Sequence, residues 1–150
     1  MIVIKIIAVI VLLIILLFIY GYILDLISAK KHKSFLESLN GKSLYISTNK
    51  KDFSDLNELL ITKFNQDIIQ VKLIAGNVNS TFDADKIHRL ISQEKLKNFP
   101  IAIIVKNNKL IHKSFYSDFK IWSKEVNKAD LAYKKITEWY DNQLRQEVSS

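Results

Sequence analysis

The stretch that decides the fold is residues 98–110, Asn-Phe-Pro-Ile-Ala-Ile-Ile-Val-Lys-Asn-Asn-Lys-Leu. Its apolar run at 101–105 is typical of a central strand that is buried on both faces. Pro100 cannot donate a hydrogen bond to a sheet ladder, so its place directly before the run indicates the start of the strand. Asn107 and Asn108 tolerate the positive φ angles of a tight turn, after which residues 110–115 return as a second strand. The stretch therefore predicts a β-hairpin that begins at Pro100.

Two further strands and a helix are predicted upstream of this hairpin. Residues 43–47 form a short apolar run after Gly41, and residues 68–74 alternate apolar and polar side chains, as a half-buried strand requires. Between them, apolar side chains spaced by three and four predict a helix that Asp52 or Ser54 caps. Its apolar face consists of Phe53, Leu56, Leu59, Leu60 and Phe64.

The remaining segments predict a loop and two more helices. Residues 77–80 are expected to form a loop, and Asp83 or Asp85 then caps a second helix. Residues 116–126 fit both an alternating strand and one face of a helix, and both alternatives stay open. The apolar face of a final helix is formed by Leu131, Ala132, Ile136, Trp139, Tyr140 and Leu144. We expect its aromatic residues, with Trp122, to lie in the core rather than on a partner surface.

The order strand, helix, strand, helix, proline-led strand, hairpin strand and helix resembles a thioredoxin-like domain over residues 42–144. Residues 98–110 are similar to the stretch of that family in which a cis-proline precedes a central strand. The resemblance implies an α/β fold with a mixed sheet flanked by helices, and a cis bond between Phe99 and Pro100. Three features depart from the family: residues 48–53 lack its Cys-x-x-Cys motif, Asn108 stands where glycine is usual, and residues 116–126 are an extra stretch. Among membrane-anchored members, the chain resembles the accessory proteins of bacteriocin export, which implies a bacterial protein.

The first 27 residues predict one transmembrane helix. Residues 6–24 carry no charge, and a helix of that length spans about 28 Å, close to the thickness of a bilayer core. A cleaved signal peptide is the alternative, but its apolar region is shorter and ends at a small-x-small site. Here Tyr20, Tyr22 and Asp25 follow instead. The expected organisation is an uncleaved anchor at 1–27, a basic juxtamembrane helix at 28–41 and an α/β domain at 42–150.

The residues that flank the span indicate contact with a membrane surface. Tyr20 and Tyr22 stand where an aromatic belt belongs, and the lysines beyond them can attract anionic lipid headgroups. Those lysines are Lys30, Lys31 and Lys33. They outnumber the single Lys5 before the span, so the positive-inside rule favours a cytoplasmic domain on the cell membrane. The margin is only one or two charges, which leaves the side of the membrane open.

Composition excludes several kinds of chemistry. The chain has no cysteine, so disulfides, thiol nucleophiles and thiolate metal sites are excluded. The net charge of +7 comes from 20 lysines and only 2 arginines, a balance that does not favour nucleic-acid recognition. His32, His88 and His112 show no metal-ligand spacing, and no serine has a recognisable catalytic context. We therefore expect no enzymatic activity, cofactor or metal.

The expected function is binding of a protein or peptide partner. In cysteine-containing members of the family that the chain resembles, the surface around the cis-proline and the first helix holds peptides. The corresponding residues are Asn49, Lys50, Lys51, Asp52, Phe53, Phe99 and Pro100. A non-redox, membrane-anchored accessory protein is therefore the leading hypothesis. The alternatives are an immunity or toxin-neutralising membrane protein, which would act through its anchor and basic flank, and an enzyme of unrecognised type.

Overall fold

The computed structural model of the chain describes residues 1–64, 67–80, 82–125 and 127–145. The chain divides into two compact units, Met1–Phe35 and Leu36–Ser150. Each unit is described by itself below.

The first unit is a single helix. Helix α1 (Ile2–Ser38) begins there and continues through most of the predicted juxtamembrane segment. Over residues 4–27 the large apolar side chains of the helix are exposed, including Leu17 and Phe18 at 70% and 75%. The helix is long and apolar enough to cross a membrane, a property that a signal sequence near the N-terminus shares. One N-terminal apolar helix was predicted from the sequence, and the structure confirms it.

The second unit contains a mixed five-stranded sheet in the order β3-β2-β1-β4-β5. Strands β1 (Ser43–Thr48) and β2 (Ile68–Ile74) are parallel, and helix α2 (Ser54–Ile61) connects them. Strand β3 (Asn77–Ser80) pairs antiparallel with β2 at one edge. On the other side, β4 (Ile101–Lys106) pairs antiparallel with β1 and with β5 (Lys109–Ser114). The predicted α/β class and mixed sheet are therefore confirmed.

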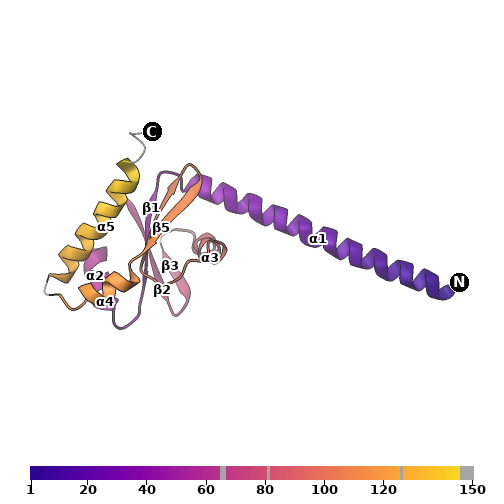
Figure 1. Cartoon of the computed structure of the whole chain (residues 1–150), viewed down its shortest axis with the longest axis horizontal. Coiled ribbons are helices and arrows are strands. Elements are labelled where there is room, and N and C mark those ends of the chain that lie inside the picture. Colours follow the sequence, from indigo (N-terminus) through magenta and orange to yellow (C-terminus); the bar gives the residue numbers. More distant parts are fainter. Residues whose placement is uncertain (65–66, 81, 126, 146–150) are drawn as a thin grey trace. The chain divides into compact units, whose positions relative to one another are not determined.

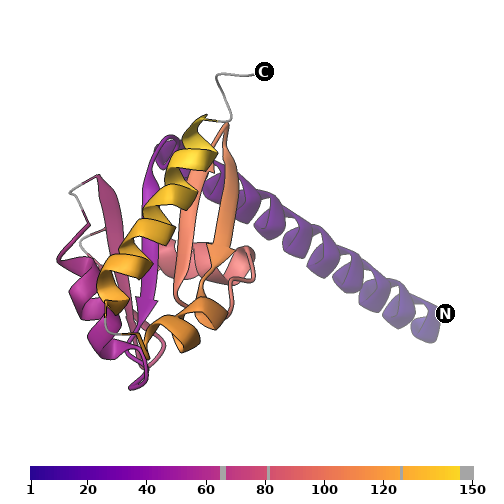
Figure 2. The ribbon, with the colours of Figure 1, turned by 60° about the vertical axis from the view of Figure 1, so that its left-hand side comes forward.

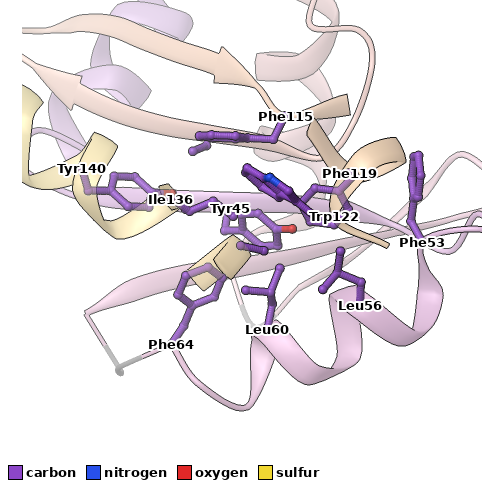
Figure 3. Packing of buried hydrophobic residues seen from close by; sticks show 12 residues of the cluster. Tyr45, Phe53, Leu56, Leu60, Phe64, Phe115, Phe119, Trp122, Ile136 and Tyr140 are labelled. Atoms are coloured by element: carbon purple, nitrogen blue, oxygen red, sulfur yellow. The ribbon is translucent and has the colours of Figure 1, made fainter. Parts of the chain in front are cut away.

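Helices cover both faces of the sheet. Helices α2, α4 (Tyr116–Trp122) and α5 (Lys128–Arg145) lie on one face, and α3 (Ala84–Gln93) lies on the other (Figures 1 and 2). Aromatic side chains fill the space between the three helices and the sheet (Figure 3). The buried residues of this cluster are Tyr45, Phe53, Leu56, Leu60, Phe64, Ala102, Phe115, Phe119, Trp122, Ala132, Ile136 and Tyr140. Trp139 packs against them, so the expected core position of the aromatic residues is confirmed.

The folded part of the second unit begins before residue 42. Leu36 and Leu39, from the last turn of α1 and the residues after it, are 8% and 0% exposed. Gly41 adopts a positive φ of 77°, which ends a helix at little cost in glycine. Its N–H donates to the Val105 carbonyl at 2.8 Å. Residues 36–41 are thus tied to the sheet.

Several local predictions need correction. Residues 77–80 form strand β3 rather than a loop, because Ala75 and Gly76 turn the chain with positive φ angles and return it along β2. Neither Asp52 nor Ser54 caps α2: Phe53 occupies the N-cap without a side-chain hydrogen bond.

Other segments are now resolved. Residues 116–122 of the ambiguous segment form helix α4. The Asp83 cap is confirmed, since its carboxylate accepts a hydrogen bond from the Lys86 N–H. Leu59 and Leu144, which were expected on buried faces, are 46% and 47% exposed.

Candidate partner-binding site

Strand register brings the predicted site loops to one end of the sheet. Ile101, the first residue of β4, pairs with Ile46 of β1 on one side and with Ser114 of β5 on the other. Pro100 therefore lies beside the end of β1, from which residues 49–53 emerge. Its carbonyl accepts a 2.9 Å hydrogen bond from the Phe115 N–H. We call the loops 49–53 and 98–100, together with the start of α4, the loop end of the sheet.

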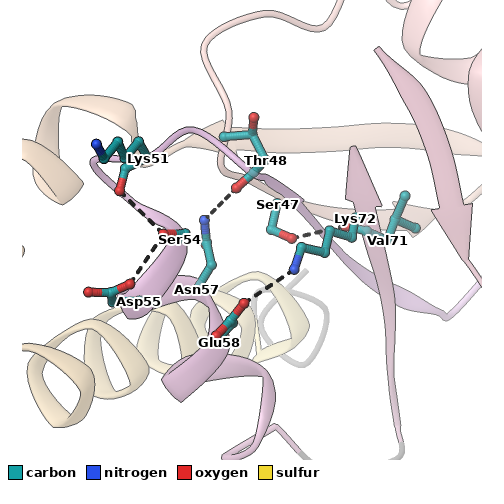
Figure 4. Close-up of polar contacts among 9 residues, drawn as sticks. All are labelled: Ser47, Thr48, Lys51, Ser54, Asp55, Asn57, Glu58, Val71 and Lys72. Carbon is teal, nitrogen blue, oxygen red and sulfur yellow. Dashed lines mark hydrogen bonds and ion pairs between the residues drawn. The ribbon is translucent and has the colours of Figure 1, made fainter. Parts of the chain in front are cut away.

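Loop 49–53 is exposed but anchored by its backbone. The Asn49 N–H donates to the Leu73 carbonyl at 3.1 Å, and the Phe53 N–H donates to the Lys50 carbonyl at 2.9 Å. The Ser54 hydroxyl donates to the Lys51 carbonyl at 3.3 Å (Figure 4). The side chains from Asn49 to Asp52 are all exposed. The loop thus presents four polar side chains from a fixed backbone.

Phe53 has a different environment from the other predicted site residues. Its side chain is only 3% exposed, and its ring makes edge contacts with Tyr116 and Phe119 at centroid distances of 5.5 and 5.6 Å. Figure 3 shows it at the start of α2, facing the α4 side chains. Phe53 therefore anchors the loop in the core.

The second loop places Phe99 and Pro100 next to β1. Phe99 is half-buried and Pro100 is buried. The peptide bond between them is cis, as the resemblance implied, and Asn98 adopts a φ of 60°. The Ser114 hydroxyl donates to the Asn98 carbonyl. Both ends of this loop are thus held by the β4-β5 hairpin.

A buried polar residue of α2, Asn57, forms side-chain hydrogen bonds with β1 next to the loop end. Its amide nitrogen donates to the Thr48 carbonyl at 3.0 Å (Figure 4), and its Oδ1 accepts a 2.8 Å hydrogen bond from the Tyr45 hydroxyl. Burial raises the pKa of the Tyr45 phenol well above its ordinary value, so the hydroxyl stays protonated and donates. Asn57 was not predicted as a site residue. Asn57 directly follows Leu56 and lies inside the apolar stripe of the helix. A polar residue in that place was the feature of the sequence from which its burial could have been predicted.

Two lysines meet one aromatic ring at the loop end. Lys50 Nζ lies 5.0 Å from the centroid of the Tyr116 ring, and Lys120 Nζ lies 4.7 Å from it. These are cation–π distances. Tyr116 and Lys120 were not predicted as site residues, because the secondary structure of residues 116–126 was ambiguous in sequence. Nearby, Lys113 Nζ lies 5.0 Å from the Phe115 centroid.

The predicted membrane-surface residues belong to the first unit. Tyr20 and Tyr22 are 62% and 65% exposed on α1. Lys30, Lys31 and Lys33 are exposed on the same helix. These five residues define a second candidate surface, within the first unit.

The loop end is a candidate binding surface that presents cationic, amide and aromatic groups. Over the described ranges, no three His, Asp or Glu side chains gather in a way that could hold a metal ion. Comparison of the chain with family models, with curated proteins and with solved structures gave no match.

Proposed function

We propose that the protein is a non-redox, membrane-anchored accessory protein whose thioredoxin-like domain binds an extended segment of a protein or peptide at the loop end. The strand order β2-β1-β4-β5, with α2 between parallel β1 and β2 and a hairpin of β4 and β5, supports a thioredoxin-like domain. In this proposal β3 is an addition at the β2 edge.

The observation that carries the proposal is the convergence of loops 49–53 and 98–100 beside Tyr116. The two loops are separated by more than 40 residues in sequence, and the pairing of Ile101 with Ile46 brings them together. Exposed side chains lie on an anchored backbone there, and a preorganised surface of this kind loses little entropy when it binds an extended chain. Since the chain contains no cysteine, such binding involves no thiol exchange.

The second part of the proposed function is attachment to the membrane through α1. Helix α1 is proposed to span the cell membrane once, with Tyr20 and Tyr22 at the interface and Lys30, Lys31 and Lys33 near anionic headgroups. Three lysines after the span against one before it favour a cytoplasmic domain. Lipid is thus the second proposed partner, independent of the protein or peptide at the loop end.

Photocrosslinking in membranes tests this proposal. A benzophenone amino acid would replace Lys51 in the exposed loop, Lys30 on α1, or Lys109 at the β4-β5 turn as a control. We expect a protein or peptide adduct from position 51 and none from position 109. Adducts from position 30 alone would contradict the proposal and favour a partner held by the flank of the anchor, as in an immunity protein.

A further inference from the structure

Three lysines at the loop end, Lys50, Lys51 and Lys120, differ from other lysines of the domain in their ion pairing. Elsewhere the domain pairs lysines with its own carboxylates, for example Lys63 with Asp130 at 2.8 Å and Lys86 with Asp83 at 3.0 Å. Among the residues that the structure describes, Lys50, Lys51 and Lys120 form no such ion pair. Asp52 and Asp118, the acidic residues nearest to them in sequence, also form none in the described part of the chain. The cationic groups at this end therefore remain available to a partner.

Two of these charges lie close to the same aromatic ring. Lys50 Nζ and Lys120 Nζ each lie no more than 5.0 Å from the centroid of one ring, that of Tyr116. The two ammonium groups are consequently no more than about 10 Å apart, roughly one Debye length in 0.1 M salt. The ring itself is held by an edge contact with buried Phe53 at 79°. The Tyr116 ring therefore brings both ammonium groups to one small part of the surface.

From these positions we infer that the loop end selects an acidic extended peptide, in which carboxylates at alternate positions contact Lys50 and Lys120. Side chains at positions i and i+2 of an extended chain point to the same face and lie about 7 Å apart. That spacing fits two ammonium groups within 10 Å of each other. The inference rests on the proposed function and specifies the chemistry of its partner.

Peptide binding to the full chain in phosphatidylcholine nanodiscs tests the inference. The probes are two fluorescein-labelled decapeptides, one of alternating Glu and Thr and one of alternating Gln and Thr. We expect the Glu peptide to bind at least about tenfold more tightly, and its affinity to fall steeply with added salt. Equal affinity for the two peptides would overturn the inference and leave the proposed peptide binding intact. Absence of binding by both would overturn the inference as well.

A pair of double variants separates a specific site from general attraction to a basic protein. Lys50→Gln/Lys120→Gln removes both ammonium groups at the loop end. Lys42→Gln/Lys109→Gln removes two exposed lysines at the opposite end, where Lys42 Nζ lies 5.5 Å from the Phe82 ring. Both variants have the same net charge and change only exposed side chains, and their thermal unfolding would confirm that they remain folded.

We expect the loop-end variant to bind the Glu peptide about tenfold more weakly and the control variant less than twofold more weakly. Equal losses in the two variants would overturn the inference, because net charge alone would then explain binding. Anionic lipid is the competing ligand for the same lysines. If vesicles of phosphatidylserine bind the nanodisc-embedded chain through Lys50 and Lys120 while the Glu peptide does not, the inference is also overturned.

Discussion

Tyr45 and Asn57 form the buried hydrogen bond that holds helix α2 against strand β1. The Tyr45 hydroxyl donates to Asn57 Oδ1 at 2.8 Å, and the same amide donates to the Thr48 carbonyl at 3.0 Å. Tyr45 and Asn57 are 0% and 1% exposed. The Asn57 side chain therefore joins α2, which follows loop 49–53, to β1, which precedes it, and so links the packing of the core to the geometry of the loop end.

The first prediction concerns this asparagine. Asn57→Ala removes the partner of the buried Tyr45 hydroxyl and of the part-buried Thr48 carbonyl. A buried group left unsatisfied costs about 1–3 kcal/mol. We expect the free energy of unfolding to fall by about 2 kcal/mol or more, measured by urea denaturation. Asn79→Ala, on an exposed position of β3, is the matched control and should change stability by less than about 0.5 kcal/mol. Equal effects of the two substitutions would contradict this role of Asn57.

The second prediction concerns where the folded domain begins. We expect a fragment of residues 36–150 to fold without the rest of α1, because its strand and helix faces bury one another. A fragment that starts at residue 42 lacks the buried Leu36 and Leu39. Loss of a buried leucine side chain typically costs about 2–5 kcal/mol, so the shorter fragment should be less stable by at least about 2 kcal/mol. Amide NMR spectra and urea denaturation of both fragments measure the difference, and equal stability would refute the assignment of residues 36–41 to the domain.

The third prediction is a pH dependence that arises from Asp83. Hydrogen bonds with Lys86 hold the pKa of the Asp83 carboxyl below its ordinary value of 3.8. A carboxyl with a lowered pKa in the folded state contributes stability above its ordinary pKa, and this contribution is lost as the pH falls through the folded value. Asp83→Asn keeps a capping oxygen but does not titrate. We expect the Tm of the wild type to fall more than that of the variant between pH 5 and pH 2.5. Parallel decreases would show that Asp83 has no part in the acid sensitivity.

The fourth prediction concerns the anchor. Residues 6–24 have no charge and no small-x-small cleavage site, so we expect the protein to stay in the membrane pellet after an alkaline wash, at its unprocessed mass. Intact-mass spectrometry of the pellet provides the measurement. A mature N-terminus near residue 25 or 30 would indicate a signal sequence and contradict the anchor.

Short-range sequence patterns predicted most of the fold. Strand β2 was predicted with its observed bounds of 68 and 74, because alternation of apolar and polar residues has a period that only a strand satisfies. The start of β4 after Pro100 was equally clear. Strand β3 was missed since three of its four residues, Asn-Val-Asn-Ser, are polar, as in a loop. These residues adopt a strand conformation because they pair with β2, which is a tertiary interaction.

The candidate site could be predicted only in part. The four exposed residues from Asn49 to Asp52 were identified, because a resemblance located the loop between the first strand and the first helix. Tyr116 and Lys120 were not, since the contact between Lys50 and Tyr116 joins residues 66 positions apart in sequence. Such a contact depends on the register of β1, β4 and β5. The periodic spacing of apolar residues in the sequence does not predict it.

The most direct test of the proposed partner site is hydrogen–deuterium exchange of the full chain in nanodiscs, with and without the partner that crosslinks to position 51. The account predicts slower exchange in residues 49–53 and 98–99 when the partner is bound, and unchanged exchange at the β4-β5 turn, residues 107–109. Protection at that turn or along residues 20–33 of α1, with none in the two loops, would contradict it.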